Sequence, residues 1–321
     1  MISSLNVLSK SNSITTVVLL VLAIGGLYVT RTTLLLPSYH KKDNGNISGN
    51  ANSISTSLAV ATRIHKGNSS QMTSFESIAE FVRSVSYAKV IILCIGIGDK
   101  LENIDYINKL ETYLQVQGLI PSASSLSTSL SYSSILILPV TPWGKFTMAL
   151  NAIVHKCIDE KFDLVAFQSL EFRIKKETVN KLVNIIKDDT NTLVVGPALP
   201  GHDFKAGLNN IEGRTCPWNT FAIWNVNHLG LVGFPMVGDG MGTETSGVEE
   251  VTTVNLLQKI NNRLKVVLVS SKGVEWRTEF KDDEKRQQYH DEKMKSKNER
   301  PEKQMKWLGI QSGRVSHIIE E

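Results

Sequence analysis

The sequence predicts an α/β fold, a single Rossmann-related domain with a mostly parallel central sheet covered by helices and preceded by an N-terminal transmembrane helix. Apolar runs such as "VIILCIG" and "LVAF" suit strands that are buried on both faces. These runs alternate with segments of helical period, which is typical of parallel sheets. A chain of 321 residues, 41% hydrophobic and 21% charged, also suits one large globular domain.

The amino-terminal segment differs from the rest of the chain. Residues 14–30 carry no charge, and the apolar character continues to residue 36 with only Arg31 interrupting it. Since about 20 apolar residues span a bilayer, we expect a transmembrane signal anchor at 14–36, after a short tail at 1–13. A cleaved signal sequence or an organelle presequence is an open alternative, because no acidic residue precedes Asp43.

The flanks of this anchor give conflicting signals about orientation. Lys10 lies on one side, whereas Arg31, Lys41 and Lys42 lie on the other, so the positive-inside rule does not favour a lumenal carboxyl-terminal half. The sequons that begin at Asn46 and Asn68 would be glycosylated only in a lumen. We expect a single-pass membrane glycoprotein of the ER or Golgi with a lumenal carboxyl-terminal domain, and the orientation stays open.

Composition divides the remainder of the chain. Residues 37–73 are rich in Asn, Ser and Gly and predict a flexible stalk. We expect the folded domain at 74–280 and a charged helical extension at 281–321.

The net charge of +4 is too small to indicate nucleic-acid binding. The three cysteines lie far apart, which supports neither a disulfide framework nor a zinc site.

Periodicity predicts the elements of the first half of the domain. Apolar residues at helical spacing predict helices, and short apolar runs predict buried strands. Gly118 is a suitable cap for the second helix, and Pro142 a suitable start for the third. The expected order is helix 74–85, strand 88–98, helix 101–118, loop or short helix 120–134, strand 135–140, helix 142–161, strand with a polar turn 162–172, helix 175–189 and strand 191–197.

The regular alternation ends after Pro197. Residues 198–217 predict a long loop, and loops of this length usually carry function. A strand-like segment, a short helix with a turn, and a Gly-rich loop that we expect to be mobile follow. A helix and a final strand come last. The expected ranges are strand 218–226, short helix with turn 228–237, Gly-rich loop 238–247, helix 248–263 and strand 264–270.

Several common kinds of site are disfavoured. Gly96 and Gly98 supply half of a dinucleotide-binding G-x-G-x-x-G, but Leu101 occupies the third glycine position. No His pair at i, i+4 indicates a zinc helix, and no G-x-S-x-G indicates a serine hydrolase. The lysine-rich stretch 292–300 is typical of a solvated helix face.

Glu249 and Glu250 form the most suggestive pair. They open a predicted helix directly after the Gly-rich loop, where the helix dipole favours carboxylates. Taken by themselves, the two residues are better explained by ordinary charge placement in a first helical turn. A carboxylate at such a junction is also what a general base requires.

Three stretches carry a family resemblance in order: "WGKFTMALNAIVHKCIDEKFDLVAFQSLEF", "RTCPWNTFAIWNVNHLGLVGF" and "GVEEVTTVNLLQKI". They resemble three motifs of the nucleotide-sugar glycosyltransferases of the GT-A type, family 2-like group. In order, these motifs are a helix with A-R-N followed by a strand ending in D-x-D, an acceptor-side strand with a G-G-F turn, and a helix that opens with E-D. The resemblance implies a GT-A-like domain, a nucleotide-sugar co-substrate, and a glycan, lipid or protein acceptor.

The resemblance also implies residue roles. Glu249 and Glu250 fall on the E-D places, whose second carboxylate is the catalytic base in inverting members. Acceptor contacts fall on Trp218, Asn219 and Trp224. Donor contacts fall on residues at the expected carboxyl edge of the sheet, namely Gly98, Asp99, Lys145, Asn151, Ser169 and Glu171.

The departures from that family concern the metal. Ser169-Leu170-Glu171 replaces D-x-D, which leaves Glu171 as the single carboxylate that could bind Mg²⁺ or Mn²⁺. Leu150 replaces the arginine of A-R-N. Lys145 or Arg214 could stabilise the leaving diphosphate in place of a metal. A catalytically silent GT-A-like binding or scaffold domain, and another nucleotide-using α/β enzyme such as a nucleotidyltransferase, stay open as alternatives.

Overall fold

The computed structural model describes residues 21–23, 26–28, 57–65, 73–121, 134–240, 246–279 and 284–320. The chain divides into two units, Met1–Ile54 and Ser55–Glu321. In the first unit, β1 (Val21–Ala23) pairs antiparallel with β2 (Gly26–Tyr28).

Most of the predicted anchor, the tail at 1–13, and both sequons lie outside the described residues. The six described residues of the anchor, 21–23 and 26–28, belong to β1 and β2. Within the part of the chain that the structure describes, no helix has the length and apolarity needed to cross a membrane.

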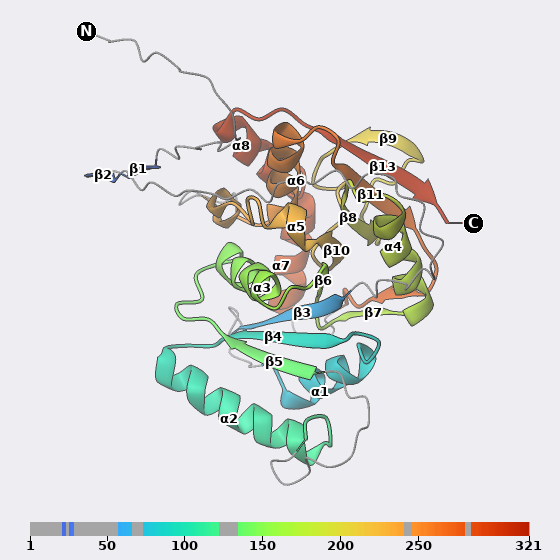
Figure 1. The fold of residues 1–321 in the computed structure, drawn as a ribbon. Helices are drawn as coiled ribbons and strands as arrows, with labels where there is room; N and C mark the ends of the chain where they lie inside the picture. The colour runs from blue at the N-terminus through green and yellow to red at the C-terminus, as the bar shows by residue number, and fades with distance from the viewer. Residues whose placement is uncertain are drawn as a thin grey trace, which may run out of the picture. The chain divides into compact units, whose positions relative to one another are not determined.

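The second unit is built on a nine-stranded sheet in the order β5-β4-β3-β6-β10-β8-β11-β13-β9 (Figure 1). The strands are β3 (Leu58–His65), β4 (Val90–Gly96), β5 (Ser134–Pro139), β6 (Leu164–Gln168), β8 (Thr192–Pro197), β9 (Gly207–Asn210), β10 (Phe221–Asn225), β11 (Lys265–Ser270) and β13 (Arg314–Ile319). All neighbours are parallel except where β10 or β9 is a partner. The central sheet is therefore mixed and mostly parallel.

Helices cover both faces of this sheet (Figure 1). One core cluster lies beneath α1 (Phe75–Ser84), α2 (Lys100–Val116) and α4 (Lys176–Asp188). The other lies beneath α3 (Thr147–Asp159), α5 (Val226–Leu229), α6 (Glu249–Ile260) and α8 (Glu299–Leu308). The 3-10 helix η1 (Met236–Asp239), α7 (Glu284–Lys295), and a small sheet of β7 (Phe172–Ile174) with β12 (Val274–Trp276) complete the unit.

Local capping explains where the first two helices begin. The Ser74 hydroxyl accepts a hydrogen bond from the backbone N–H of Ser77 at 3.2 Å, which starts α1. Asp99 accepts from the N–H groups of Leu101 and Glu102, while Glu102 accepts from the N–H of Asp99, so a capping box starts α2. The helices predicted at 74–85 and 101–118 are thereby confirmed.

Two predicted boundaries are corrected. Leu58–His65, within the predicted stalk 37–73, is a central strand, and Arg314–Ile319, within the predicted extension 281–321, is the strand between β11 and β9. Thr62 and Arg63 interrupt the apolar run of the first, and charged and polar residues dilute the second, so periodicity did not indicate either strand. The folded unit therefore includes both segments.

The antiparallel strand β10 is also a departure from the predicted pattern. The segment between β8 and β10 contains β9 but no helix. A parallel neighbour needs a crossover connection, usually a helix, whereas an irregular loop can return the chain antiparallel. Cys94, Cys157 and Cys216 are free and buried.

Candidate functional site at the carboxyl edge of the sheet

The carboxyl ends of β3 and β6 bring two sequence-distant segments together. The strands are parallel, and Ala61 is paired with Phe167, so Arg63 and Ser169 follow two residues further along each strand. The Arg63 guanidinium lies 3.7 Å from Oε1 of Glu249, at the start of α6. Ligands of open α/β sheets bind outside this edge, so the S-L-E turn and the glutamate pair share the expected location.

The segment Trp218-Asn219-Thr220 joins the candidate groups in consecutive contacts. The Trp218 ring lies beneath the Lys297 ammonium, which is 3.6 Å from the ring centroid. The Asn219 Nδ2 donates to Glu249 Oε1 at 3.3 Å, and the Ser169 N–H donates to the Thr220 carbonyl at 2.9 Å. One short stretch of backbone therefore connects the S-L-E turn, the glutamate pair and a lysine of the carboxyl-terminal segment.

Glu249 and Glu250 are both 4% exposed at the amino end of α6. Burial, and then the neighbouring charge of Glu249, raise the pKa of Glu250 to about 7, against the opposing effects of Lys297, a backbone hydrogen bond and Arg63. A carboxyl group that titrates near neutral pH is suited to accept a proton in catalysis. Glu249, held by Arg63 and Asn219, is the fixed partner of the pair.

Lys297 contributes the cation of this group. Burial lowers the pKa of the Lys297 ammonium to about 8, while Glu250 and Glu249 raise it and Arg300 and Lys293 lower it. On the same indole, His202 stacks with its ring centroid 3.6 Å from that of Trp218. The site therefore contains two buried carboxyl groups and an ammonium at close quarters.

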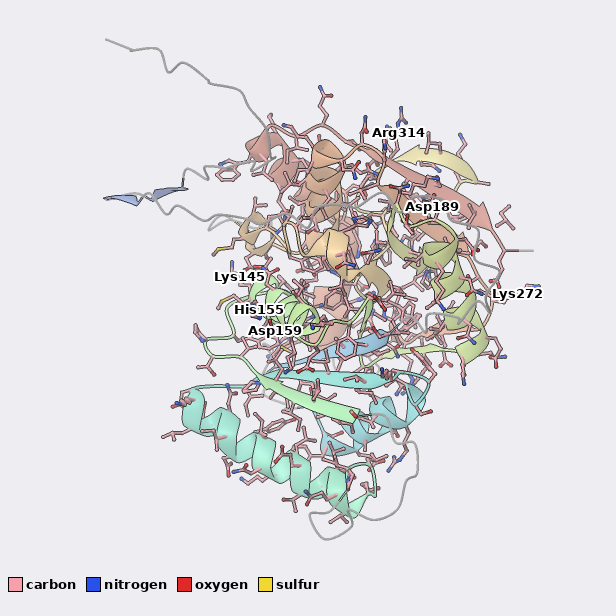
Figure 2. The ribbon with its side chains drawn as sticks, in the orientation of Figure 1. Lys145, His155, Asp159, Asp189, Lys272 and Arg314 are labelled. Carbon is pink, nitrogen blue, oxygen red and sulfur yellow. The ribbon has the colours of Figure 1, made fainter. Side chains whose placement is uncertain are left out.

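Three of the predicted donor residues, Gly98, Asp99 and Lys145, lie just before the starts of α2 and α3. Asp99 caps α2, and a Cβ at Gly98 would lie 1.6 Å from the Glu102 carboxylate that completes the cap. Lys145 is exposed in the loop before α3 (Figure 2). The Asp99 carboxylate is engaged in the cap of α2, and the donor role of Asp99 and Lys145 stays a prediction.

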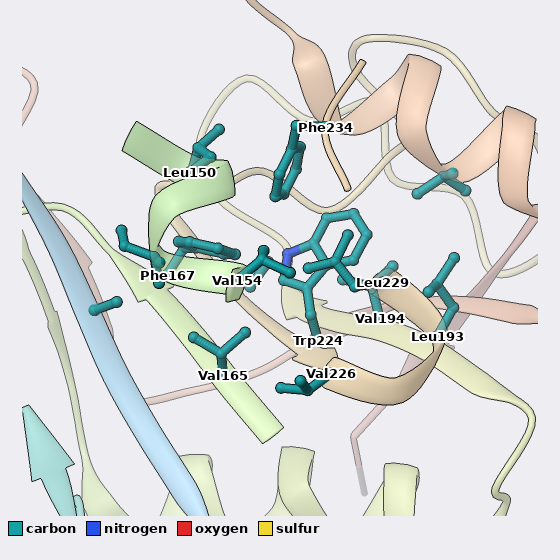
Figure 3. Close-up of a cluster of buried hydrophobic side chains, with 14 of the residues drawn as sticks. Leu150, Val154, Val165, Phe167, Leu193, Val194, Trp224, Val226, Leu229 and Phe234 are labelled. Carbon is teal, nitrogen blue, oxygen red and sulfur yellow. The ribbon is translucent and has the colours of Figure 1, made fainter. Parts of the chain in front are cut away.

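The A-R-N positions pack into the fold. Asn151 accepts from the Phe234 N–H at 2.7 Å and donates to the Phe234 carbonyl at 2.9 Å, which fixes the turn at 233–234. Gly233 has φ of 66°, and a Cβ there would approach Asn151 Oδ1 to 2.6 Å. Leu150 is fully buried in the hydrophobic core (Figure 3). Both amide atoms of Asn151 are therefore engaged by backbone.

The predicted acceptor residues are covered in this conformation. Trp224 is fully buried, packs against Phe234 with centroids 5.4 Å apart, and donates from Nε1 to Asn219 Oδ1 at 3.0 Å (Figure 3). Trp218 is 1% exposed and donates from Nε1 to the Gly213 carbonyl at 2.6 Å. The two indoles offer no surface to an acceptor here. Trp224 instead holds Asn219, and through it Glu249, in place.

The S-L-E turn supplies few metal ligands. The Ser169 hydroxyl lies 3.4 Å from the Thr220 carbonyl, and the Glu171 carbonyl accepts from the Arg277 N–H at 3.2 Å. Among the residues described, no group of three or more His, Cys, Asp or Glu could hold a metal ion. A divalent cation takes about six oxygen ligands, so one carboxylate and one hydroxyl do not fit a resident metal ion.

Sequence reasoning missed four residues of this region. Arg63 lay in a predicted stalk, and Lys297 and Arg300 lay in a charge run that gave no specific signal. Asp239 was also missed: its carboxylate accepts from the Phe146 N–H at 2.6 Å and from the Thr147 N–H and hydroxyl at 2.8 and 2.6 Å, which fixes the start of α3.

Arg214, predicted as a substitute for the metal, is occupied elsewhere. Its Nη1 donates to the Gly201 carbonyl at 3.0 Å and its Nη2 to the Met294 carbonyl at 2.6 Å. The guanidinium thus ties the loop after β8 to α7.

Comparisons with known proteins give similarity in structure only. No protein-family model and no curated protein matches the chain. A mannosyltransferase from Pyrobaculum calidifontis in complex with GDP-Man and Mn²⁺ is similar at 10% identity and a TM-score of 0.43, over 63% of this chain and 52% of that one. The chain thus spans about half of that enzyme's length.

Two further solved structures are similar at a comparable level. Glucosyl-3-phosphoglycerate synthase from Mycobacterium tuberculosis, in complex with phosphoglyceric acid, is similar at 11% identity and a TM-score of 0.44, over 76% of this chain and 81% of that one. A cytidylyltransferase from Leptospira borgpetersenii is similar at 8% identity and a TM-score of 0.37, over 68% and 76%. Similarities this low carry no argument about activity.

Proposed function

We propose that this protein transfers a sugar from a nucleotide-sugar donor to an acceptor hydroxyl, with Glu250 as the general base. The observation that carries the proposal is the buried Glu249–Glu250 pair, which opens α6 beside the S-L-E turn at the carboxyl edge of the sheet. The acceptor is a glycan, a lipid or a protein.

The chemistry assigns one step to Glu250. Its carboxylate takes the proton of the acceptor hydroxyl while the hydroxyl oxygen bonds to the anomeric carbon of the sugar. The bond from that carbon to the diphosphate oxygen breaks, and the nucleoside diphosphate leaves with the electron pair. A base requires a pKa near the working pH, and burial beside Glu249 raises the pKa of Glu250 to about 7.

Glu249 acts differently from its neighbour. Arg63 and Asn219 both contact its Oε1, so its charge is compensated and its position is fixed. We assign it the role of a positioning residue: it holds the start of α6 and raises the proton affinity of Glu250.

The second candidate function is a catalytically silent binding domain. It is favoured by the burial of Glu249, Glu250 and Trp218, each no more than 4% exposed, since an acceptor hydroxyl must reach the base. Substrate binding would have to open this region for catalysis. In a silent domain it would stay closed.

Membrane anchoring is part of the proposal and rests on the sequence. The apolar segment 14–36 would anchor the chain in the ER or Golgi, with the folded unit in the lumen. Cell-expressed chain that migrates faster after glycosidase treatment, but not when Asn46 and Asn68 are both replaced by Gln, supports this orientation. An unchanged wild-type mobility together with protease sensitivity of the folded unit in sealed microsomes contradicts it.

The test of the proposed activity is a transfer assay on the full-length chain. A panel of nucleotide sugars is incubated with microsomal acceptors, and release of nucleoside diphosphate is measured together with sugar incorporation. We expect Glu250→Gln to lose transfer by about 10²-fold or more while nucleotide binding persists. Glu212→Gln, an exposed change, is the matched control.

Three results would redirect the assignment. Nucleotide binding without transfer from any donor in the panel supports the silent binding domain. Pyrophosphate release from nucleoside triphosphates supports a nucleotidyltransferase. Transfer that is unaffected by Glu250→Gln shows that Glu250 is not the base.

A further inference from the structure

We propose that Lys297, from the turn between α7 and α8, is the cation that contacts the diphosphate of the donor in place of a metal ion. This inference rests on the proposed function and concerns the same site. It assigns a catalytic contact to the carboxyl-terminal segment, in which no role was predicted, and it makes nucleotide binding independent of divalent cations.

The Lys297 backbone is fixed firmly against the loop after β8. Arg214 donates from its backbone N–H to Asn298 Oδ1 at 2.8 Å and from Nη2 to the Met294 carbonyl at 2.6 Å. Gly213 leaves no room for a side chain, because a Cβ there would lie 1.8 Å from the Lys297 carbonyl oxygen. Contacts on both sides of Lys297 therefore fix where its side chain begins.

The Lys297 ammonium is connected to the S-L-E turn through Trp218. It lies 3.6 Å from the centroid of the Trp218 ring, and two residues later the Thr220 carbonyl accepts from the Ser169 N–H. The Trp218 ring also packs against Trp276, which pairs with Phe172 directly after the turn. Two separate sets of contacts thus connect the indole beneath the ammonium to the turn where metal-binding carboxylates would stand.

The charges around Lys297 fit this role. Glu249 and Glu250 attract the ammonium, Arg300 and Lys293 repel it, and His202 packs on the same indole. Arg63 compensates Glu249, and the raised pKa of Glu250 leaves part of its population uncharged near pH 7. The local balance is therefore cationic, and an ammonium there would stabilise phosphate oxygens.

A purely structural role is the competing explanation, because Lys297 could serve only as the ion partner of Glu250. The two explanations differ in which ligand loses affinity. A diphosphate contact affects pyrophosphate and nucleoside diphosphates but spares a nucleoside, whereas a distorted site weakens all three. Arginine at this position would restore the charge and hence the diphosphate contact.

The experiment titrates the full-length chain with UDP, GDP, inorganic pyrophosphate and the matching nucleosides by calorimetry, in EDTA and in Mn²⁺. We expect wild-type binding of a nucleoside diphosphate in EDTA, with less than about a twofold gain in Mn²⁺. Lys297→Met should weaken diphosphate and pyrophosphate binding about 10-fold or more, with nucleoside binding retained. Lys297→Arg should restore most of the affinity. Lys295→Met, an exposed change on α7, should have no effect.

The outcomes separate the two levels of the proposal. Binding that requires Mn²⁺, that survives Lys297→Met, or that falls equally for the nucleoside overturns the Lys297 assignment and leaves the proposed function intact. If Lys297→Met does not fold, a Lys297→Arg variant with diphosphate affinity indistinguishable from that of a folded Lys297→Gln variant overturns it equally. Absence of any nucleotide binding by the wild type overturns both.

Discussion

The Arg63 guanidinium lies 3.7 Å from the Glu249 carboxylate and so connects the end of β3 to the start of α6. The Glu249 side chain is 6% exposed and that of Arg63 is 26% exposed. The pair therefore lies at the boundary between the core and solvent. It fixes the first turn of α6, and with it Glu250, against the carboxyl edge of the sheet.

Removing the cation of this pair should destabilise the fold. We expect Arg63→Met to lower the free energy of unfolding by about 1–2 kcal/mol, less than for a fully buried pair because Arg63 is partly solvated. Urea denaturation of Arg63→Met, Glu249→Gln and the double variant measures the coupling. Strictly additive effects would show that the contact contributes nothing.

The pH dependence of transfer should follow the glutamate pair. Since burial and Glu249 raise the pKa of Glu250 to about 7, kcat/KM should rise with pH up to about 7 as the base loses its proton. It should fall above about 8, where Lys297, whose pKa burial lowers, loses its charge. Glu249→Gln removes a negative neighbour of both groups, so both limbs of the profile should move to lower pH. A profile that does not move contradicts the assignment.

The stability of the fold should decrease in acid through His202. Its Nδ1 accepts from the Leu199 N–H at 2.8 Å and its Nε2 donates to the Cys216 carbonyl at 3.1 Å, which describes a neutral ring. Burial, and then Lys297, lower the pKa of His202 from 6.5 to about 3. Below pH 6.5 the unfolded chain binds a proton that the folded chain does not, so stability falls as pH decreases from 6.5 to 3.

The measurement is the free energy of unfolding between pH 4 and 7.5. The loss assigned to His202 is on the order of 3 kcal/mol, allowing for the solvent that reaches this half-buried ring. His202→Asn should flatten the curve, whereas His155→Gln, on the exposed face of α3, should leave it unchanged. Equal slopes for wild type and His202→Asn would refute the prediction.

Asp239 should matter more for stability than the cap of α2. It accepts three hydrogen bonds from Phe146 and Thr147, whereas Asp99 accepts two at an exposed helix start. We expect Asp239→Ala to cost about 2–3 kcal/mol and Asp99→Ala about 1 kcal/mol. Chemical denaturation of both variants checks the order, and a larger loss for Asp99→Ala would contradict it.

Trp224 should act on the site through Asn219. Trp224→Phe removes the hydrogen bond to Asn219 Oδ1 and leaves a small cavity in the core, so we expect a loss of about 2–3 kcal/mol. Because Asn219 also donates to Glu249, transfer should decrease with little change in nucleotide affinity. A variant that binds nucleotide more weakly but keeps its turnover would assign Trp224 to substrate contact instead.

The site could be predicted only in part, for a physical reason visible in single residues. Glu249 and Glu250 follow a Gly-rich loop and open an apolar period, and this local signal placed them correctly at the start of α6. Asn151 matched a motif, yet its amide binds the Phe234 backbone. Local sequence does not reveal which partner an amide finds, because that partner is 83 positions away.

The sequence by itself determined the alternation of strands and helices, because apolar period and helix caps are set by neighbouring residues. The helices at 75–84, 100–116, 147–159, 176–188 and 249–260 follow from it directly. It also determined that Ser169-Leu170-Glu171, the stretch that the family resemblance aligns with D-x-D, contains a single carboxylate.

Only the tertiary structure decided the membership of β3 and β13 in the sheet, the antiparallel direction of β10, and the approach of Lys297 to Trp218. Each depends on pairing between segments far apart in the chain. Such pairing is stabilised by burial and hydrogen bonds that exist only after the chain has folded. The position of the Lys297 ammonium over the Trp218 ring is therefore a property of the fold, since residues 292–300 alone have the pattern of a solvated helix.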